Sequence, residues 1–282
     1  MRLRSGRRLV NGVAMQRRQI VVAGNYTHDT LLGAEERHEL GGSAAYVSAV
    51  LRAAGADFSV VANVGDDFRY AERVPPPRVV RGARTTSFVD DYRSGERVGT
   101  LRAAAPPLTP EDLRERCSIG LAVAVAGEIP VETLLRLREL SDVLLADAQG
   151  FVRAFDAAGR VLHRPPDPEL LAALERVDYL KAGRAEADVL DLPRLRRSCT
   201  VLLTDGPRGC TVLSEAEGMH VPAFPAREVD PTGAGDCFLA GFAVGLLRGW
   251  PARRAALLAN WCGARAVESP GLPTFAALPD LE

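Results

Sequence analysis

Cysteine is scarce in this 282-residue sequence, and its five cysteines are widely scattered and form no C-x-x-C pair. An odd number at such spacing excludes a disulfide framework and an obvious zinc site, and it fits a reducing compartment. Long hydrophobic runs are also missing, because no apolar segment approaches the about 20 residues that a membrane-spanning helix needs. We therefore expect a cytoplasmic protein without a membrane partner.

An excess of charge of one sign is absent too. The 35 basic and 36 acidic residues give a net charge of -1, and 47% of the residues are hydrophobic. This balance is typical of a globular protein with a full core, and it argues against nucleic acid or an anionic membrane as the main partner. Lysine is almost absent: Lys181 is the only one, which excludes any mechanism that needs two lysines.

The start of the chain departs from this balance. Six arginines lie within residues 1–18, and the first acidic residue of the chain is Asp29. An arginine-rich, acid-free start is typical of an organellar transit segment, but this one lacks a clear amphipathic apolar face. We expect residues 1–18 to be a disordered tail, with organellar targeting as the alternative, and residues 19–282 to form one domain.

Beyond the tail, short β-type runs alternate with helical ones. Buried strands are expected at 20–24, 58–64, 121–126, 143–147, 177–181 and 201–204, and two long helices at 236–248 and 251–267. Strand and helix in alternation favour right-handed βαβ units, so we expect an α/β fold with a doubly wound, mostly parallel sheet covered by helices on both faces. Residues 85–101 alternate more loosely and predict a small excursion of exposed antiparallel strands.

The most informative stretch is D-P-T-G-A-G-D, residues 230–236, which lies between a strand-like segment and a strongly periodic helix. Gly233 and Gly235 lack a Cβ, so the backbone can turn sharply and approach a ligand closely. The N–H groups that open the helix then point at an anion, which the helix dipole favours. Asp236 falls in the first turn, beside that anion. A plain helix N-terminus is the alternative interpretation.

Familiar phosphate-binding motifs are missing. Lys181 follows a leucine, so no G-x-x-x-x-G-K-[ST] loop exists, and no G-x-G-x-x-G opens a helix after the first strand. The H-R-D and D-F-G motifs of protein kinases are absent as well. Any nucleotide is therefore held in another way.

Two glycine motifs resemble those of a known family. Gly41 and Gly42 before an early helix, with D-P-T-G-A-G-D late in the chain, are similar to the signatures of the PfkB, or ribokinase-like, carbohydrate kinases. The likeness runs from about Ile20 to Phe275 in the family's order and spacing. Segments such as G-N-Y-T-H-D and V-A-G-E-I-P resemble those of plant myo-inositol kinases. The resemblance implies a ribokinase-like fold with a small β lid, formed here around 85–101.

The resemblance also implies catalytic roles. Asp236 corresponds to the base that takes the proton from the acceptor hydroxyl. Gly233, Ala234 and Gly235 correspond to the anion hole for the transferred γ-phosphoryl group. Phosphoryl transfer passes through a loose transition state, so preorganised backbone donors suit it.

On the substrate side, Asp29 matches the acidic residue that binds substrate hydroxyls, and a turn-forming aspartate is the alternative. Gly41 and Gly42 match the diglycine where the backbone passes close to the substrate, and Asn25 is assigned to the same side. The family often has Asn where this chain has Tyr46, which fits a substrate other than ribose or fructose. None of the four histidines shows metal spacing, and His28 is the one expected near the site.

On the donor side, the resemblance assigns four residues to ATP: Thr204, Gly206, Asn260 and Gly263. Glu186 matches the acid of an N-x-x-E element that organises Mg²⁺ through water, although Gly183 replaces its asparagine. Asp230 and Thr232 fall where many relatives ligate a monovalent cation, so K⁺ is a further expected cofactor.

Together these features predict an ATP-dependent kinase that phosphorylates a hydroxyl of a cyclic polyol, myo-inositol above others. One alternative is a kinase of the same fold that acts on a sugar or nucleoside. Another is a catalytically silent interaction module, although the intact D-P-T-G-A-G-D stretch argues against it. The expected partners are the small substrate and ATP, with no nucleic acid, in a monomer or homodimer.

Overall fold

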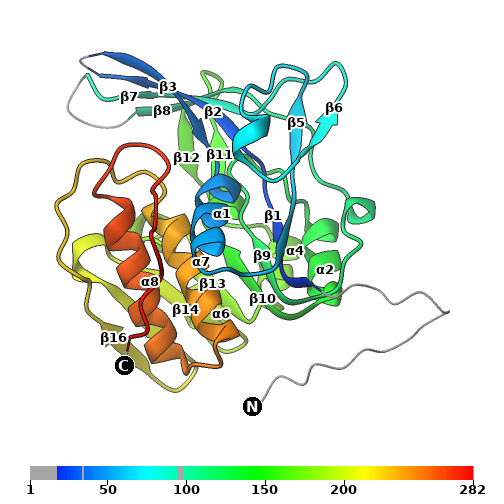
Figure 1. Ribbon diagram of the computed structural model, residues 1–282. Helices are drawn as coiled ribbons and strands as arrows, with labels where there is room; N and C mark the ends of the chain where they lie inside the picture. Colours follow the sequence, from blue (N-terminus) through cyan, green and yellow to red (C-terminus); the bar gives the residue numbers. More distant parts are fainter. Residues whose placement is uncertain (1–17, 34, 94–97, 282) are drawn as a thin grey trace.

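The computed structural model describes residues 18–33, 35–93 and 98–281, so residues 1–17 of the expected tail lie outside the described part (Figure 1). The centre of the fold is an eight-stranded sheet. Its strands, in spatial order, are β16 (Gly218–Val221), β15 (Cys210–Leu213), β14 (Thr200–Thr204), β13 (Tyr179–Ala182), β10 (Ser141–Asp147), β9 (Cys117–Ala122), β1 (Arg18–Ala23) and β4 (Phe58–Val61). The strands from β14 to β4 are parallel, and β15 and β16 form an antiparallel hairpin at one edge.

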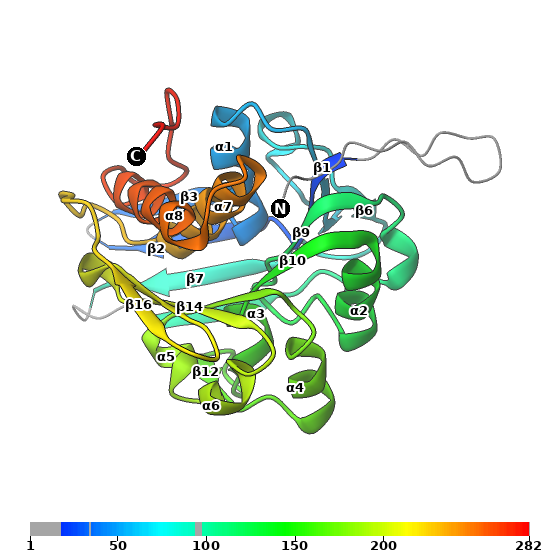
Figure 2. The ribbon, with the colours of Figure 1, turned by 90° about the horizontal axis from the view of Figure 1, so that it is seen from below.

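Helices cover both faces of this sheet (Figure 2). One face carries α1 (Ser43–Ala53), α7 (Ala234–Leu247) and α8 (Ala252–Ala266), and their apolar side chains share one core with the sheet. The other face carries α2 (Val131–Leu140), α4 (Pro168–Leu174) and α6 (Leu192–Leu195) over a second core. Burial on both faces explains the nearly continuous apolar runs of the central strands. The expected doubly wound α/β fold is confirmed.

A second, four-stranded sheet lies over one end of the first and is called the lid here. Its order is β3 (Glu36–Gly41), β2 (Thr27–Leu32), β7 (Ser87–Asp91) and β8 (Val98–Ala103). β7 and β8 correspond to the excursion expected at 85–101, but the sequence analysis missed β2 and β3. Their sequences, T-H-D-T-L-L and E-R-H-E-L-G, contain few apolar residues, because only one side of the lid is partly covered.

Short elements complete the described chain. A parallel pair joins β5 (Asn63–Gly65) to β6 (Arg78–Val80), and β11 (Arg153–Phe155) and β12 (Val161–His163) form an antiparallel hairpin. The remaining short helices are α3 (Gln149–Val152), α5 (Arg184–Ala187) and three 3₁₀ turns at Ala71–Arg73, Pro110–Asp112 and Gly206–Arg208.

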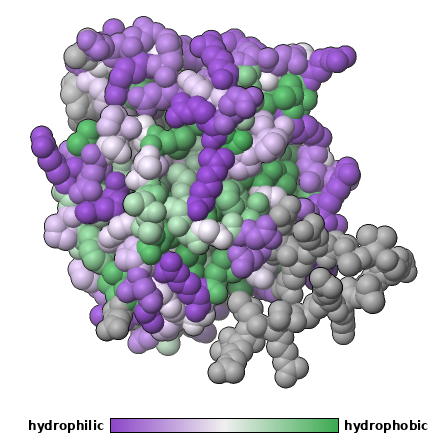
Figure 3. Space-filling view, in the orientation of Figure 1, coloured by the Kyte–Doolittle hydropathy of each residue, from purple (hydrophilic) through white to green (hydrophobic). Residues whose placement is uncertain are grey.

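The lid and the helices also differ in the polarity of their surfaces. On the face seen in Figure 3, hydrophilic side chains cover the upper part, where the lid strands lie, and apolar ones gather lower down, among the helices. Of the helices in the described part, none has the length and apolar character to cross a bilayer. The lid stands over the carboxyl ends of the parallel strands, which is where α/β folds commonly bind their ligands.

Candidate active site

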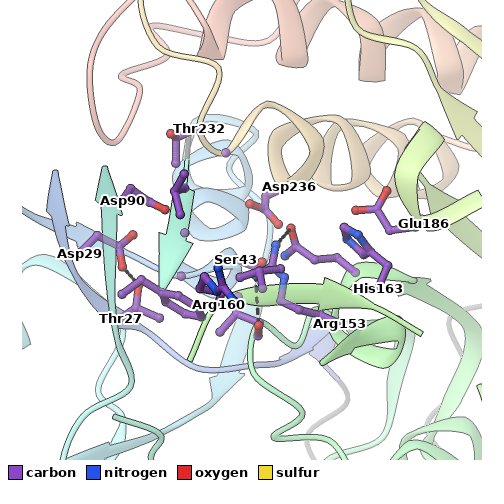
Figure 4. Close-up of a pocket in the computed structure, with 18 of the residues that line it drawn as sticks. Thr27, Asp29, Ser43, Asp90, Arg153, Arg160, His163, Glu186, Thr232 and Asp236 are labelled. Atoms are coloured by element: carbon purple, nitrogen blue, oxygen red, sulfur yellow. Dashed lines mark hydrogen bonds between the residues drawn. The ribbon is translucent and has the colours of Figure 1, made fainter. Parts of the chain in front are cut away.

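A cavity of about 730 Å³ opens between the lid and the main sheet, within the size range of small-molecule sites. Side chains from the lid, from the β11–β12 hairpin and from α1, α5 and α7 converge on it (Figure 4). The polar and charged residues that line it are Thr27, Asp29, Ser43, Asp90, Gln149, Arg153, Asp156, Arg160, His163, Glu186, Thr232 and Asp236. Its wall is therefore rich in polar and charged groups, which suits hydroxyl-rich or anionic ligands.

A tight turn at Gly233 opens helix α7 on this wall. Gly233 has φ +78°, a left-handed conformation that glycine adopts without strain, and the helix starts at Ala234. The Tyr46 ring packs against its Cα, and a methyl group on Gly233 would lie 2.5 Å from Tyr46 Cγ. The turn thus presents the first N–H groups of a fourteen-residue helix toward the cavity, the arrangement that stabilises an anion.

Asp236 follows in the first turn of α7 and lines the same cavity. Burial raises the pKa of its carboxyl to about 6, and the negative charge of Asp147 adds to the rise, while the nearby Ser43 hydroxyl, Lys181 and Arg153 oppose it. Asp236 Oδ1 is buried and finds no hydrogen-bond partner of good geometry among the described residues. A half-buried carboxylate with an unpaired oxygen, facing a cavity, is suited to accept a proton from a bound hydroxyl.

Asp29 lies on lid strand β2, on the opposite side of the cavity from Asp236 (Figure 4). Its Oδ1 accepts a hydrogen bond of 2.6 Å from the Thr27 hydroxyl. Gly41, on the neighbouring strand, leaves room for this carboxylate, since a methyl there would lie 2.5 Å from Asp29 Cγ. Gly42 has φ +87° and starts the turn into α1. The diglycine therefore both seats Asp29 and opens the helix.

The structure places Asn25 beneath this region, with none of its surface exposed. Its N–H donates to Glu128 Oε1 at 3.0 Å, and its Oδ1 accepts from the N–H of Asn63 at 2.7 Å. Among the described residues that line the cavity, Asn25 does not occur. These contacts tie the segment that follows β1 to Glu128 and to β5.

Glu186 faces the cavity from α5, and Gly183 stands where the N-x-x-E element has asparagine. The Glu186 carboxylate occupies the space of the absent side chain: a methyl on Gly183 would lie 2.5 Å from Glu186 Oε2. The departure from the motif therefore changes where this carboxylate rests, folding it back toward the end of β13.

The four residues assigned to ATP lie on connected elements beside α7, outside the lining of the cavity. The Thr204 hydroxyl donates to the Ala182 carbonyl at 3.3 Å, and Gly206 opens the following turn. Asn260, on α8, donates to the carbonyls of Val221 and Pro222. Gly263 packs against the start of α7, because a methyl there would lie 3.3 Å from the Ala234 carbonyl.

Two arginines that sequence analysis missed lie beside Gly206. Arg184 and Arg208 both pair with Asp205, next to Gly206. These ion pairs hold the pKa of the Asp205 carboxyl well below its usual range. Neither belongs to a phosphate-binding signature, so only the folded chain shows that they meet.

Asp230 and Thr232 lie close together at the entry to the α7 turn. Asp230 is buried, and its oxygens accept from the N–H groups of Thr232 and Gly271 at 2.9 and 3.3 Å. Thr232 Oγ1 is buried and, among the described residues, has no hydrogen-bond partner. An unpaired buried oxygen beside a buried carboxylate fits the oxygen ligands of a monovalent cation.

The β11–β12 hairpin also lines the cavity, and the sequence analysis did not identify it. It brings Arg160 and His163 to the side facing the lid, and Leu101 of β8 donates to the Gly159 carbonyl at 2.8 Å. The expected histidine, His28, instead stacks on Phe68 with ring centroids 5.7 Å apart. Neighbouring residues on a strand point to opposite faces, so Asp29 faces the cavity and His28 faces away.

Comparisons with known proteins agree with this geometry. A family model described as pfkB family carbohydrate kinase matches residues 161–278. Inositol 3-kinase from Oryza sativa subsp. japonica is 45% identical over 276 residues, which cover 90% of this chain and 70% of that protein. Inositol 3-kinase from Arabidopsis thaliana is 37% identical over 270 residues, 92% of this chain and 76% of that protein.

Solved structures show the same fold. A pyrophosphate-dependent kinase of the ribokinase family, complexed with a pyrophosphate analog and myo-inositol, has a TM-score of 0.76 at 22% identity, over 90% of this chain and 97% of that one. Ribokinase from Thermotoga maritima has a TM-score of 0.70 at 20% identity, over 90% and 94%. At such identities the likeness concerns the fold.

Proposed function

Because this chain belongs to the pfkB family of carbohydrate kinases and is a kinase that phosphorylates an alcohol, we propose that its acceptor is a cyclic polyol, myo-inositol, and its donor ATP. The relatives that are 37–45% identical over most of the chain are inositol 3-kinases, which supports this acceptor. The observation that carries the proposal is one cavity with Asp29 on its lid side and Asp236, beside the Gly233 turn, on the other.

The proposed chemistry follows from this placement. The Asp29 carboxylate accepts hydrogen bonds from two hydroxyls of the polyol and fixes the ring. Asp236 takes the proton of the attacking hydroxyl. The oxygen of that hydroxyl bonds to the γ-phosphorus while the bond between the γ-phosphorus and the donor's bridging oxygen breaks. The N–H groups at Gly233, Ala234 and Gly235 stabilise the charge on the phosphoryl oxygens in this loose transition state.

Two cations belong to the proposal. Mg²⁺ binds through one or two carboxylates and retains several waters, so the single Glu186 carboxylate at the cavity edge fits it. When bound, it neutralises charge on the donor phosphates. Asp230 and Thr232 would hold K⁺ beside the anion hole, as the unpaired Thr232 hydroxyl suggests. Thr204, Gly206, Asn260 and Gly263 would form the side that binds the nucleoside of ATP.

A donor and acceptor panel tests the proposal. The purified protein is incubated with ATP or pyrophosphate, with and without Mg²⁺ and K⁺, and with myo-inositol, ribose, fructose or inosine. We expect myo-inositol to be phosphorylated from ATP when Mg²⁺ is present, and faster with K⁺ than with an equal concentration of a tetraalkylammonium salt. Turnover of ribose, fructose or inosine in preference would overturn the acceptor, and turnover with pyrophosphate alone would overturn the donor.

Substitution Asp29→Asn is expected to weaken polyol binding more than catalysis. An amide loses the charge-assisted hydrogen bonds, each worth about 1.5–3 kcal/mol, so KM for the polyol should rise by about 10- to 100-fold. KM for ATP should stay unchanged. Asp91→Asn is the matched control, since Asp91 lies on lid strand β7 and pairs with Arg93 rather than lining the cavity. An unchanged polyol KM in Asp29→Asn would remove this residue from the substrate site.

The pH dependence of kcat/KM should have an acid limb near pH 6. Burial and the Asp147 charge raise the pKa of Asp236 to about 6. The base works only when ionised, so activity is full above this pKa and falls as the pH drops through it. The measurement is kcat/KM for the polyol from pH 5 to 8 at saturating Mg²⁺-ATP. A flat profile across pH 5–7 would show that a different group accepts the proton.

A further inference from the structure

The chain's only lysine lies buried directly behind the cavity. Lys181, on β13, is 6% exposed, and its Nζ donates to both carboxylate oxygens of Asp147, at 3.2 and 3.0 Å. Asp147 ends the adjacent parallel strand β10 and is the register partner of Lys181. Register partners on parallel strands project to the same face, so the two side chains are placed to pair by the sheet itself.

The ammonium group touches the turn that opens α7. A methyl group on Gly235 would lie 2.7 Å from Lys181 Nζ and 3.1 Å from its Cε. Only the absence of a side chain at Gly235 lets the charge approach the helix backbone this closely. Although burial alone lowers the pKa of Lys181, the carboxylates of Asp147, Glu186 and Asp236 raise it above the ordinary lysine value, so the side chain is charged.

Stability does not account for this arrangement. Removing two charges from water costs about as much as their attraction returns, and a well-packed apolar pair of similar size serves a core equally well. The main sheet otherwise fills both of its cores with apolar side chains. What distinguishes this pair is its place beneath the first turn of α7.

We propose that Lys181, oriented by Asp147, is a positioning residue for phosphoryl transfer: its fixed positive charge behind Gly235 keeps Asp236 ionised and adds to the field of the anion hole. The inference rests on the proposed function and deepens it. A charge held in place before the reaction needs no reorganisation when negative charge develops on the phosphoryl group, which is why preorganised groups are effective. Asp147 restricts where this charge stands.

The groups that face Asp236 come from every element packed around it. They are Asp147 of β10, Lys181 of β13, Arg153 of β11, Ser43 and Tyr46 of α1, Cys237 of α7 and, through Lys181, Glu186 of α5. The two members of the pair act on Asp236 in opposite directions, because Asp147 raises its pKa and Lys181 lowers it. If the pair acts on proton transfer, replacing Asp147 should lower the pKa of Asp236 and replacing Lys181 should raise it.

The test compares Lys181→Met, Asp147→Asn and the double variant with the wild type. In Lys181→Met the acid limb of kcat/KM should move up by about one pH unit, because a nearby positive charge has been lost. Plateau kcat should fall by about tenfold, less than for a donor in direct contact with the phosphoryl group. In Asp147→Asn the limb should move down. The double variant, which leaves no uncompensated buried charge, should fold and have its limb between those of the single variants.

A readout without turnover separates this inference from the proposed function. The ¹³Cγ resonance of Asp236, assigned by its absence in Asp236→Asn, is followed against pH in each variant. Arg194→Met is the control, since it removes an ion pair with Glu175 that lies outside the lining of the cavity. If the Asp236 titration does not move in opposite directions in the two single variants, the inference is wrong even where the wild type phosphorylates myo-inositol. If the titration moves as expected and no polyol is phosphorylated, the proposed function fails and the charge coupling stands.

Discussion

Asp236→Asn is expected to reduce kcat by about a thousandfold, which is within the range for loss of a general base. The amide has nearly the shape of the carboxylate but cannot accept the proton of the attacking hydroxyl. Binding of the polyol should be unchanged, because Asp29 and the lid are untouched. The thermal midpoint should stay the same or rise, since burial disfavours the charged form of this side chain.

The measurements are kcat in the phosphoryl-transfer assay, polyol affinity by calorimetry and thermal unfolding. Asp178→Asn serves as the control, because Asp178, just before β13, accepts hydrogen bonds from Arg138 and from the N–H of Leu144 on β10. It should lose stability and keep its kcat. An Asp236→Asn variant that retains a tenth or more of wild-type kcat would show that the proton leaves by another route.

Gly233→Ala should be the second most damaging substitution, with kcat lowered by about 100-fold or more. Alanine disfavours the φ of +78° at this position, and its methyl group would collide with the Tyr46 ring. The turn must then shift and carry the N–H groups of the anion hole away from the phosphoryl oxygens. Removing one such donor costs about 10²–10³ in kcat in other enzymes.

Gly249→Ala isolates the backbone cost from the loss of function. Gly249 has φ +73°, and a methyl there would meet no atom within 4 Å. It should lose about 1–2 kcal/mol of stability, the price of a left-handed alanine, and keep full kcat. If Gly233→Ala shows the same small effect on kcat as Gly249→Ala, the turn does not hold the phosphoryl group.

The order of strands and helices could be predicted from the sequence because the central strands are apolar and the two long helices are strongly periodic. Strand β9 shows the limit of that approach: it was expected at 121–126 but runs from Cys117 to Ala122. Gly120 and Ser118 break its apolar pattern. In the fold, Gly120 packs beneath the Ser141 hydroxyl and Leu144, where a larger residue would not fit. Long-range packing of this kind leaves little local signal.

The residues of the candidate site also fall into two groups, those that a local motif indicates and those that only the fold brings together. Asp236, Gly233 and Asp29 lie in local motifs, so the sequence alone indicated them. Lys181 and Asp147 lie thirty-four positions apart on different strands, and only the parallel register brings them together. Arg160 and His163 reach the cavity because their hairpin packs on β8, a contact between residues that no short motif joins.

The way the lid joins the chain limits how it can be exchanged. Strand β2 continues from β1 and carries Asp29, and β3 ends at Gly41, one residue before the turn into α1. The proposed acceptor contact and the folding of the lid thus share one stretch of backbone. A chimaera that receives β7 and β8 from a relative keeps its own Asp29. One that receives β2 and β3 takes over the relative's residue at this position, its diglycine and the entry angle of α1 together. If Asp29 binds the acceptor as proposed, acceptor specificity is inherited with the first half of the lid.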